Sequence, residues 1–358
     1  MIRRFSQLLT LFRDVFMFLK LRYLHPYKAP ADKTILVDFK YPNLYHRYFY
    51  NLLKTFRIAG YYVHYPMSFS KFRNLRNGDI YIALLFKEKG LIDIRNKKVK
   101  HHIAILNDEM FSADYYKTYF VDQNAEMNSY HVPMSFHPYM YHYGHWNRPL
   151  PPVGRRKNAV FAFGNFDRTA YKKIHRAPFH IINRADLIDF LGTKPNFISA
   201  KSREYLTNLI KEDIDGRIVF AEKCHFEIQG EKVREYLSHF RYFLCCPGVF
   251  APLSHNFVEA LSAGCVPVIQ KTYADLIYPP LQQNRNAIIF EDINDLDILL
   301  KEDLFKKTDS EFLKMEQEVS RYYAAYIHPK AAAGNILKNL HKTPVYLNAS
   351  ERSVALIK

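Results

Sequence analysis

The first 28 residues combine apolar side chains at helical spacing with basic ones. The apolar positions are Ile2, Phe5, Leu8, Leu9, Phe12, Val15, Phe16 and Leu19, and the basic ones are Arg3, Arg4, Arg13, Lys20 and Arg22. This pattern predicts a cationic amphipathic helix over residues 1–28. Its longest unbroken apolar run, Val15 to Leu19, is too short to cross a bilayer, and no cleavage site of a signal peptide follows. The helix then lies either on an anionic cytoplasmic leaflet or on the protein's own core.

From residue 33 onward, short apolar segments typical of strands alternate with segments of helix length. Strands are predicted at 34–39, 61–65, 79–85, 102–106, 159–163, 217–220, 242–246, 265–269 and 286–290. Helices are predicted at 43–58, 230–240 and 255–263, and a final long one at about 309–340. Buried strands alternating with helices are typical of an α/β fold with parallel sheets covered on both faces.

A proline-rich segment at 148–155 separates two such series and predicts a linker. We therefore expect two Rossmann-like α/β domains facing a central cleft, with the chain divided into 1–28, 29–150, 151–308 and 309–358. The last part, a helix and tail, would return to the first domain.

Charge narrows the classes of partner. The chain has 51 Lys and Arg against 35 Asp and Glu, a formal net charge of +16, which implies nucleic acid, an acidic membrane surface or phosphorylated substrates. Nucleic acid is suggested by charge alone, because no nucleic-acid motif or basic tail is present. None of the four cysteines (Cys224, Cys245, Cys246, Cys265) has C-x-x-C spacing, which disfavours a zinc or redox pair and favours a reducing, cytosolic location.

The segment 243–269 carries the most chemical information. A buried strand ends just before Gly248, a polar loop follows, Ser254 can cap the next helix, and Gly264 stops that helix. Ligands of open α/β sheets bind where strand carboxyl ends meet helix N-termini, whose free N–H groups suit a phosphate. Glu259 could accept both ribose hydroxyls of a nucleotide there, or it could be an exposed helix carboxylate.

The string Glu-Ala-Leu-Ser-Ala-Gly-Cys-Val-Pro-Val-Ile at 259–269 resembles the donor half of GT-B glycosyltransferases, most closely the exostosin-like group. Residues 158–168 resemble the strand and turn that open that half, and the resemblance covers roughly 158–303. It implies that 151–308 binds a nucleotide-sugar donor and 29–150 binds the acceptor.

Two departures leave the donor nucleotide and the stereochemical course open. His255 and Asn256 stand where the exostosin-like pattern usually has a basic residue, and Ala251 stands where many retaining enzymes carry a second Glu, eight positions before Glu259. A transferase using CMP-activated 3-deoxy-octulosonic acid on the same fold therefore remains an alternative.

The resemblance also implies site residues. The donor nucleotide would lie across Gly164, Gly248, Ser254, His255, Asn256 and Glu259. Arg168, Lys223 and His225 each follow a predicted strand and would neutralise the leaving phosphates, unless they only serve solubility. Enzymes of this kind generally use no metal and no cofactor, since the nucleotide-sugar is a co-substrate.

Transfer to an acceptor hydroxyl needs a base, unless the leaving phosphate takes the proton. Asp108 and Glu109 follow the strand at 102–106, and only one of them would face substrate. Asp38, at the end of the first strand, is the second choice, and any of these carboxylates could instead cap a loop.

The stretch 130–146 is rich in His and aromatic residues. His131, His137, His142 and His145 match no common zinc spacing, so we expect this stretch to stack on a sugar ring beside the cleft, or to pack between domains.

The sequence as a whole predicts a cytoplasmic glycosyltransferase, peripheral on the inner face of the membrane. Its acceptor would be a glycan or glycolipid of the lipopolysaccharide or capsule type. A protein that binds sugar nucleotides without catalysis is the alternative from another class.

Overall fold

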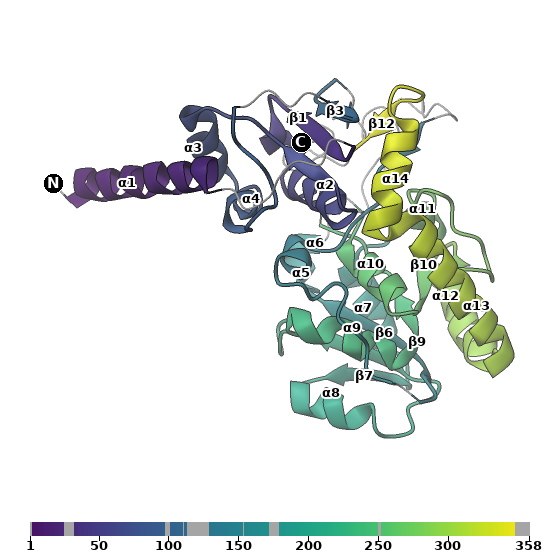
Figure 1. Cartoon of the computed structure of the whole chain (residues 1–358). Coiled ribbons are helices and arrows are strands. Elements are labelled where there is room, and N and C mark those ends of the chain that lie inside the picture. The colour runs from purple at the N-terminus through teal and green to yellow at the C-terminus, as the bar shows by residue number, and fades with distance from the viewer. Residues whose placement is uncertain are drawn as a thin grey trace. The chain divides into compact units, whose positions relative to one another are not determined.

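The computed structural model describes residues 2–24, 32–96, 101–109, 111–112, 129–152, 154–171, 179–249 and 252–347 (Figure 1). The chain divides into two compact units. The first contains the residues up to Val132 and those from Pro329 onward, and the second runs from Pro133 to His328. The division therefore falls before the proline-rich segment 148–155, because α5 (Pro138–His142) packs on α9 (Gly230–Ser238) of the second unit.

Within its described residues, the first unit contains two small parallel sheets. One has the strand order β2-β1-β3, with β1 at Thr34–Asp38, β2 at Tyr62–His64 and β3 at Ala104–Asn107. The other has the order β4-β12-β5, with β4 at Phe111–Ser112, β5 at Tyr130–His131 and β12 at Val345–Tyr346. Its helices are α1 (Ile2–Tyr23), η1 (Pro42–Leu44), α2 (Arg47–Ile58), α3 (Phe69–Gly78), α4 (Leu84–Lys87) and α14 (Pro329–Asn339).

The strand predicted at 79–85 is wrong. The carboxylate of Asp79 accepts hydrogen bonds from the backbone N–H groups of Tyr81 and Ile82, both at 2.8 Å. This local capping turns the chain, and the apolar residues that follow form the short helix α4. Apolar content alone does not distinguish a strand from a helix here, and the capping by Asp79 favours the turn and the helix over the predicted strand.

The second unit is built on one six-stranded parallel sheet with the order β11-β10-β9-β6-β8-β7. The strands are β6 (Lys157–Gly164), β7 (Phe197–Ala200), β8 (Ile218–Glu222), β9 (Phe240–Leu244), β10 (Val266–Gln270) and β11 (Ile288–Phe290). All of them except β7 match predicted strands to within a few residues. Every residue of β9 and β10 is buried, as in a sheet covered on both faces.

Helices flank this sheet along the whole unit (Figure 1). They are α5, α6 (Arg168–Tyr171), α7 (Arg184–Leu191), α8 (Arg203–Leu209), α9, α10 (His255–Ser262), α11 (Lys271–Ala274), α12 (Ile293–Ile298), η3 (Leu299–Asp303), η4 (Leu304–Lys306), α13 (Asp309–Tyr322) and η5 (Tyr323–Ile327). The helix α10 ends at Ser262, and the chain turns away two residues later at Gly264, whose φ of +80° favours glycine.

The single long helix predicted at about 309–340 is instead two. It breaks at His328, where the backbone is not helical, and α14 starts at Pro329, whose ring removes a backbone donor. The helix α14 then packs on α2, so the chain does return to the first unit after Pro329.

The structure confirms the α/β class with parallel sheets, and the predicted N-terminal helix is present as α1. None of the helices in the described ranges combines the length and the apolar content needed to cross a bilayer.

Candidate functional site

A cavity of about 800 Å³ opens at the carboxyl edge of the six-stranded sheet. Its walls include the ends of β6 and β8 and the first residues of α9 and α10. After β6 the chain forms β7 and then β8 on one side of β6, and it then crosses to β9 on the other side, so the strand order reverses next to β6. Ligands of open α/β sheets bind at this point, and the volume is typical of a small-molecule site.

Arg184, the first residue of α7, lines the cavity together with Arg203 and Lys223, and neither arginine was predicted. The side chain of Arg184 is 5% exposed, yet it forms no ion pair with any carboxylate of the described residues. Its Nε donates to the carbonyl of Pro247 at 2.6 Å and its Nη1 to that of Asn165 at 3.1 Å. The guanidinium also lies over the ring of Tyr171, 4.7 Å from the centroid. Burying a charge among neutral groups is costly, which makes the cavity wall favourable for an anion.

Gly164, at the end of β6, lets this guanidinium approach the sheet. Its φ is +131°, and a Cβ there would lie 3.0 Å from Nη1 of Arg184 and 3.5 Å from Nδ2 of Asn256. Asn256 is held in turn by a hydrogen bond from Nδ2 to the carbonyl of Phe163 at 3.1 Å. The predicted residues Gly164 and Asn256 and the newly found Arg184 therefore line the same cavity.

Glu259 is buried, at 2% exposure, and is not the exposed helix carboxylate of the alternative interpretation. Its Oε1 lies 3.0 Å from Nδ1 of His255, one helical turn earlier. Its Oε2 has no hydrogen-bond partner among the described residues. Both residues line the cavity, so Glu259 places in its wall a buried acceptor atom that nothing in this part of the chain satisfies.

Of the other basic residues predicted for the site, one lines the cavity and two do not. Lys223 lines the cavity and forms an exposed ion pair with Glu227 at 2.8 Å. Arg168 does not line it, because its guanidinium forms an ion pair with Asp189 on α7 at the surface. His225 does not line it either.

Gly248 and Ser254 do not line the cavity. The N–H of Gly248 donates to the carbonyl of Pro252 at 3.0 Å. Ser254 takes the N-cap position of α10, but its side chain makes no capping hydrogen bond. Its Oγ instead accepts from Nη2 of Arg184 at 3.4 Å, and its N–H donates to the hydroxyl of Tyr273 at 2.9 Å. Ser254 therefore helps to position Arg184.

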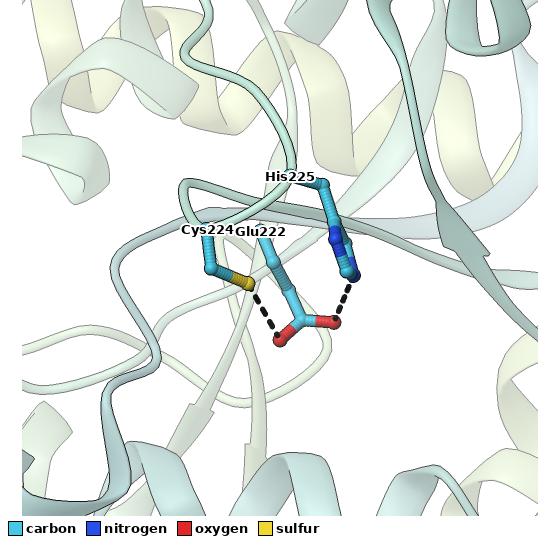
Figure 2. Close-up of side chains that lie close together, drawn as sticks. All are labelled: Glu222, Cys224 and His225. Carbon is cyan, nitrogen blue, oxygen red and sulfur yellow. Dashed lines mark hydrogen bonds and ion pairs between the residues drawn. The ribbon is translucent and has the colours of Figure 1, made fainter.

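Three side chains at the end of β8 and just after it, shown in Figure 2, could together hold a metal ion. The carboxylate of Glu222 lies 3.9 Å from Sγ of Cys224 and 3.8 Å from Nε2 of His225. Cys, His and Glu are a donor set that zinc accepts. However, the ammonium of Lys201 already lies 2.9 Å from Nε2 of His225, so a cation is present at the nitrogen that would bind the metal.

The chain also has two Asp-x-Asp triplets, at 213–215 and 295–297, and neither lines the cavity. Asp215 accepts a hydrogen bond from the N–H of Asn158 at 2.7 Å, and Asp297 forms an ion pair with Lys194 at 2.6 Å. Both triplets therefore serve contacts within the second unit.

Part of the His- and aromatic-rich stretch forms one wall of the cavity. His137, Tyr139, Met140, Tyr143 and His145 line it, and the ring of His137 meets that of His255 edge-on with centroids 5.0 Å apart. His131, by contrast, belongs to β5 of the first unit. Stacking of these rings on a sugar stays a prediction.

The carboxylates predicted as bases belong to the first unit, where β1 and β3 end. Asp108 accepts hydrogen bonds from the backbone N–H groups of Lys40 and Tyr41, so it caps the turn after β1. Asp38 and Glu109 are exposed. Burial lowers the pKa of Lys71, and the negative charges of Asp38 and Asp108 oppose that shift, which places a cation within range of both carboxylates.

No family model and no curated protein matches the chain. Among solved structures it is similar to HepE of Anabaena in complex with UDP-glucose, at 10% identity and a TM-score of 0.36 over 86% of this chain and 99% of that one. It is similar to WaaG, a glycosyltransferase involved in lipopolysaccharide biosynthesis, at 11% identity and a TM-score of 0.33 over 85% and 99%. It is also similar to the C-terminal domain of LpcC, a group 1 family glycosyl transferase from Francisella tularensis, at 12% identity and a TM-score of 0.29 over 49% and 94%. Likenesses of this size assign no function, and the exostosin-like resemblance stays a prediction.

Proposed function

We propose that the protein is a glycosyltransferase that binds the nucleotide part of a sugar donor in the cavity of the second unit. The observation that carries this proposal is Arg184, a buried guanidinium with no ion-pair partner among the described residues, which faces a cavity at the reversal point of the sheet. A nucleotide diphosphate would supply the missing anion. The unsatisfied Oε2 of Glu259 on the same wall would accept a ribose hydroxyl.

In this mechanism the bond between the sugar C1 and the phosphate oxygen breaks, and the leaving diphosphate keeps the electron pair. Arg184 and Lys223 stabilise the charge that develops on it, so the reaction needs no metal ion. The acceptor hydroxyl oxygen forms the new bond to C1. The exostosin-like and lipopolysaccharide- or capsule-type assignments are the finer part of the proposal, and the formal net charge of +16 suits an anionic glycan or glycolipid acceptor.

A carboxylate of the first unit would take the proton of the acceptor hydroxyl. Asp38 fits this role better than Asp108, because the carboxylate of Asp108 accepts from two backbone donors, while the carboxylate of Asp38 is exposed and forms no side-chain hydrogen bond or ion pair within the described residues. D38N should abolish release of the nucleotide and leave its binding unchanged. D108N, which removes the acceptor for two backbone donors, should lower the melting temperature. Wild-type turnover in D38N would exclude Asp38 as the base.

The test of the proposal is a thermal-shift panel on the full chain with UDP-, GDP-, CMP- and ADP-sugars and the free nucleotides. A ligand at 100 times its Kd stabilises the native state by about 2.7 kcal/mol, so one nucleotide family should raise the melting temperature clearly. A shift with CMP-sugars alone would identify a CMP-dependent transferase. No shift with any nucleotide would refute the donor site, and a shift without any turnover on glycan acceptors would indicate a binding protein.

A further inference from the structure

The helix α1 docks on the first unit through one narrow face. Asp14 is fully buried there, forms an ion pair with Arg76 of α3 and accepts a hydrogen bond from Nδ2 of Asn77 at 3.0 Å. Phe18, one turn later, packs between the rings of Phe69 and Phe72, with centroids 5.5 and 5.4 Å away. Figure 1 shows α1 leaving α3 as an extended rod.

The other side of α1 is apolar and uncovered by any described residue. Its exposed side chains are those of Phe5, Leu8, Leu9, Phe12, Val15, Phe16, Leu19 and Tyr23. At 3.6 residues per turn these eight positions fall within an arc of about 120°, centred about 140° around the helix from Asp14 and Phe18. We name these eight residues the apolar arc. Phe12 and Phe16, at its centre, are 64% and 71% exposed.

The charged side chains that border the apolar arc are all basic. Arg13 and Lys20 follow one edge of the arc and Arg22 follows the other, by the same helical geometry. The acidic residue of α1, Asp14, is buried against α3. An apolar strip of this length flanked by cations on both edges is complementary to a surface that is apolar inside and anionic at its boundary.

We propose that α1 lies flat in the interface of an anionic lipid bilayer, with the apolar arc inserted and the basic edges at the headgroups. The contacts of Asp14 and Phe18 with α3 fix the rotation of the helix, so the arc faces away from the first unit. A second copy of the chain suits this surface less well, because its own cationic edges would repel those of the first. This proposal does not depend on the proposed catalytic activity.

The experiment is co-sedimentation of the full chain with vesicles of phosphatidylcholine, with or without phosphatidylglycerol. The wild type should bind the anionic vesicles, and binding should weaken with added salt. The double variant F12E/F16E should bind at least tenfold more weakly. The control is I298E/L313E, which places the same two charges at exposed apolar side chains of the second unit and should bind as the wild type does. Equal binding by F12E/F16E and the wild type would overturn the proposal.

Tryptophan fluorescence tests the orientation. The natural Trp146 is buried, so F12W should add a signal that shifts to the blue with anionic vesicles. S6W, at an exposed position outside both the arc and the docking face, should show no shift. A shift for S6W but not F12W would overturn the orientation. A dimer in light scattering that F12E/F16E abolishes, without vesicle binding by the wild type, would assign the arc to a second copy and refute the proposal.

Discussion

Replacing Glu259 by Gln separates nucleotide binding from folding. Glu259 is buried, its Oε1 contacts His255, and its Oε2 has no partner among the described residues. The substitution keeps the shape of the side chain and removes the charge. Because the buried charge is only partly satisfied in the free protein, removing it should leave the melting temperature unchanged or raise it.

The cost should fall on binding. A hydrogen bond to a charged group contributes about 1.5–3 kcal/mol, and a ribose hydroxyl would make such a bond to Oε2. One lost charge-assisted bond then weakens the Kd by about 10- to 150-fold, at about 1.4 kcal/mol per factor of ten. E259Q should therefore bind the nucleotide more weakly while its melting temperature stays the same or rises. A carboxylate with a purely structural role would not produce this combination.

Isothermal titration calorimetry with the nucleotide found in the thermal-shift panel measures the Kd, and differential scanning calorimetry measures the melting temperature. The matched control is E235Q, which removes the charge of a partly exposed glutamate on α9 that pairs with Lys232. We expect the control to bind as the wild type does. A Kd for E259Q within twofold of the wild type, with the melting temperature retained, would refute the assignment of Glu259 to the ribose.

Three further outcomes are expected. G164A should bind the nucleotide more weakly and melt several degrees lower, because the new Cβ meets Arg184 at a φ that glycine favours, whereas G154A, where a Cβ meets nothing within 4 Å, should behave as the wild type in the same calorimetry. Burial lowers the pKa of His131 to about 4, whereas an unfolded histidine titrates near 6.5. His131 then has no effect on stability above about pH 6.5 and costs up to about 1.4 kcal/mol per pH unit as the pH falls below it. Urea unfolding of H131Q between pH 7 and 5 should show a shallower loss, and an unchanged slope would contradict the burial of a neutral imidazole. Finally, EDTA should leave turnover unchanged, and a loss that zinc restores would assign a metal to Glu222, Cys224 and His225.

Local patterns were sufficient for most of the second unit. The strands β6, β8, β9, β10 and β11 are short apolar runs, and the turn that follows α10 has a glycine where a left-handed residue is needed. The strand β7 was missed because Phe197–Ala200 has only four residues and Ser199 interrupts its apolar run. The strands β4, β5 and β12 were missed because each has only two residues. Their pairing also joins segments that are far apart in the chain.

The candidate site divides in the same way. Glu259 could be recognised because its neighbours in sequence form the strand end and helix start that define the site, whereas Gly164 was implied only by the resemblance of residues 158–168. Arg184 could not, since in sequence it is an ordinary basic residue at the start of a helix. Its importance comes from carbonyls after β6 and β9, supplied by Asn165, Cys246 and Pro247, which only the folded sheet brings around it.

The sequence by itself determined the α/β class, the amphipathic α1 and the edge of the sheet where a ligand would bind, because these depend on periodicity and on residues close together in the chain. Only the tertiary structure decided which cations face the cavity. Arg168 and Arg184 are equally basic, but Asp189 holds Arg168 at the surface while the loops after β6 and β9 enclose Arg184. A charge acts on a ligand according to its partners and its burial, and both depend on contacts between segments that are distant in sequence.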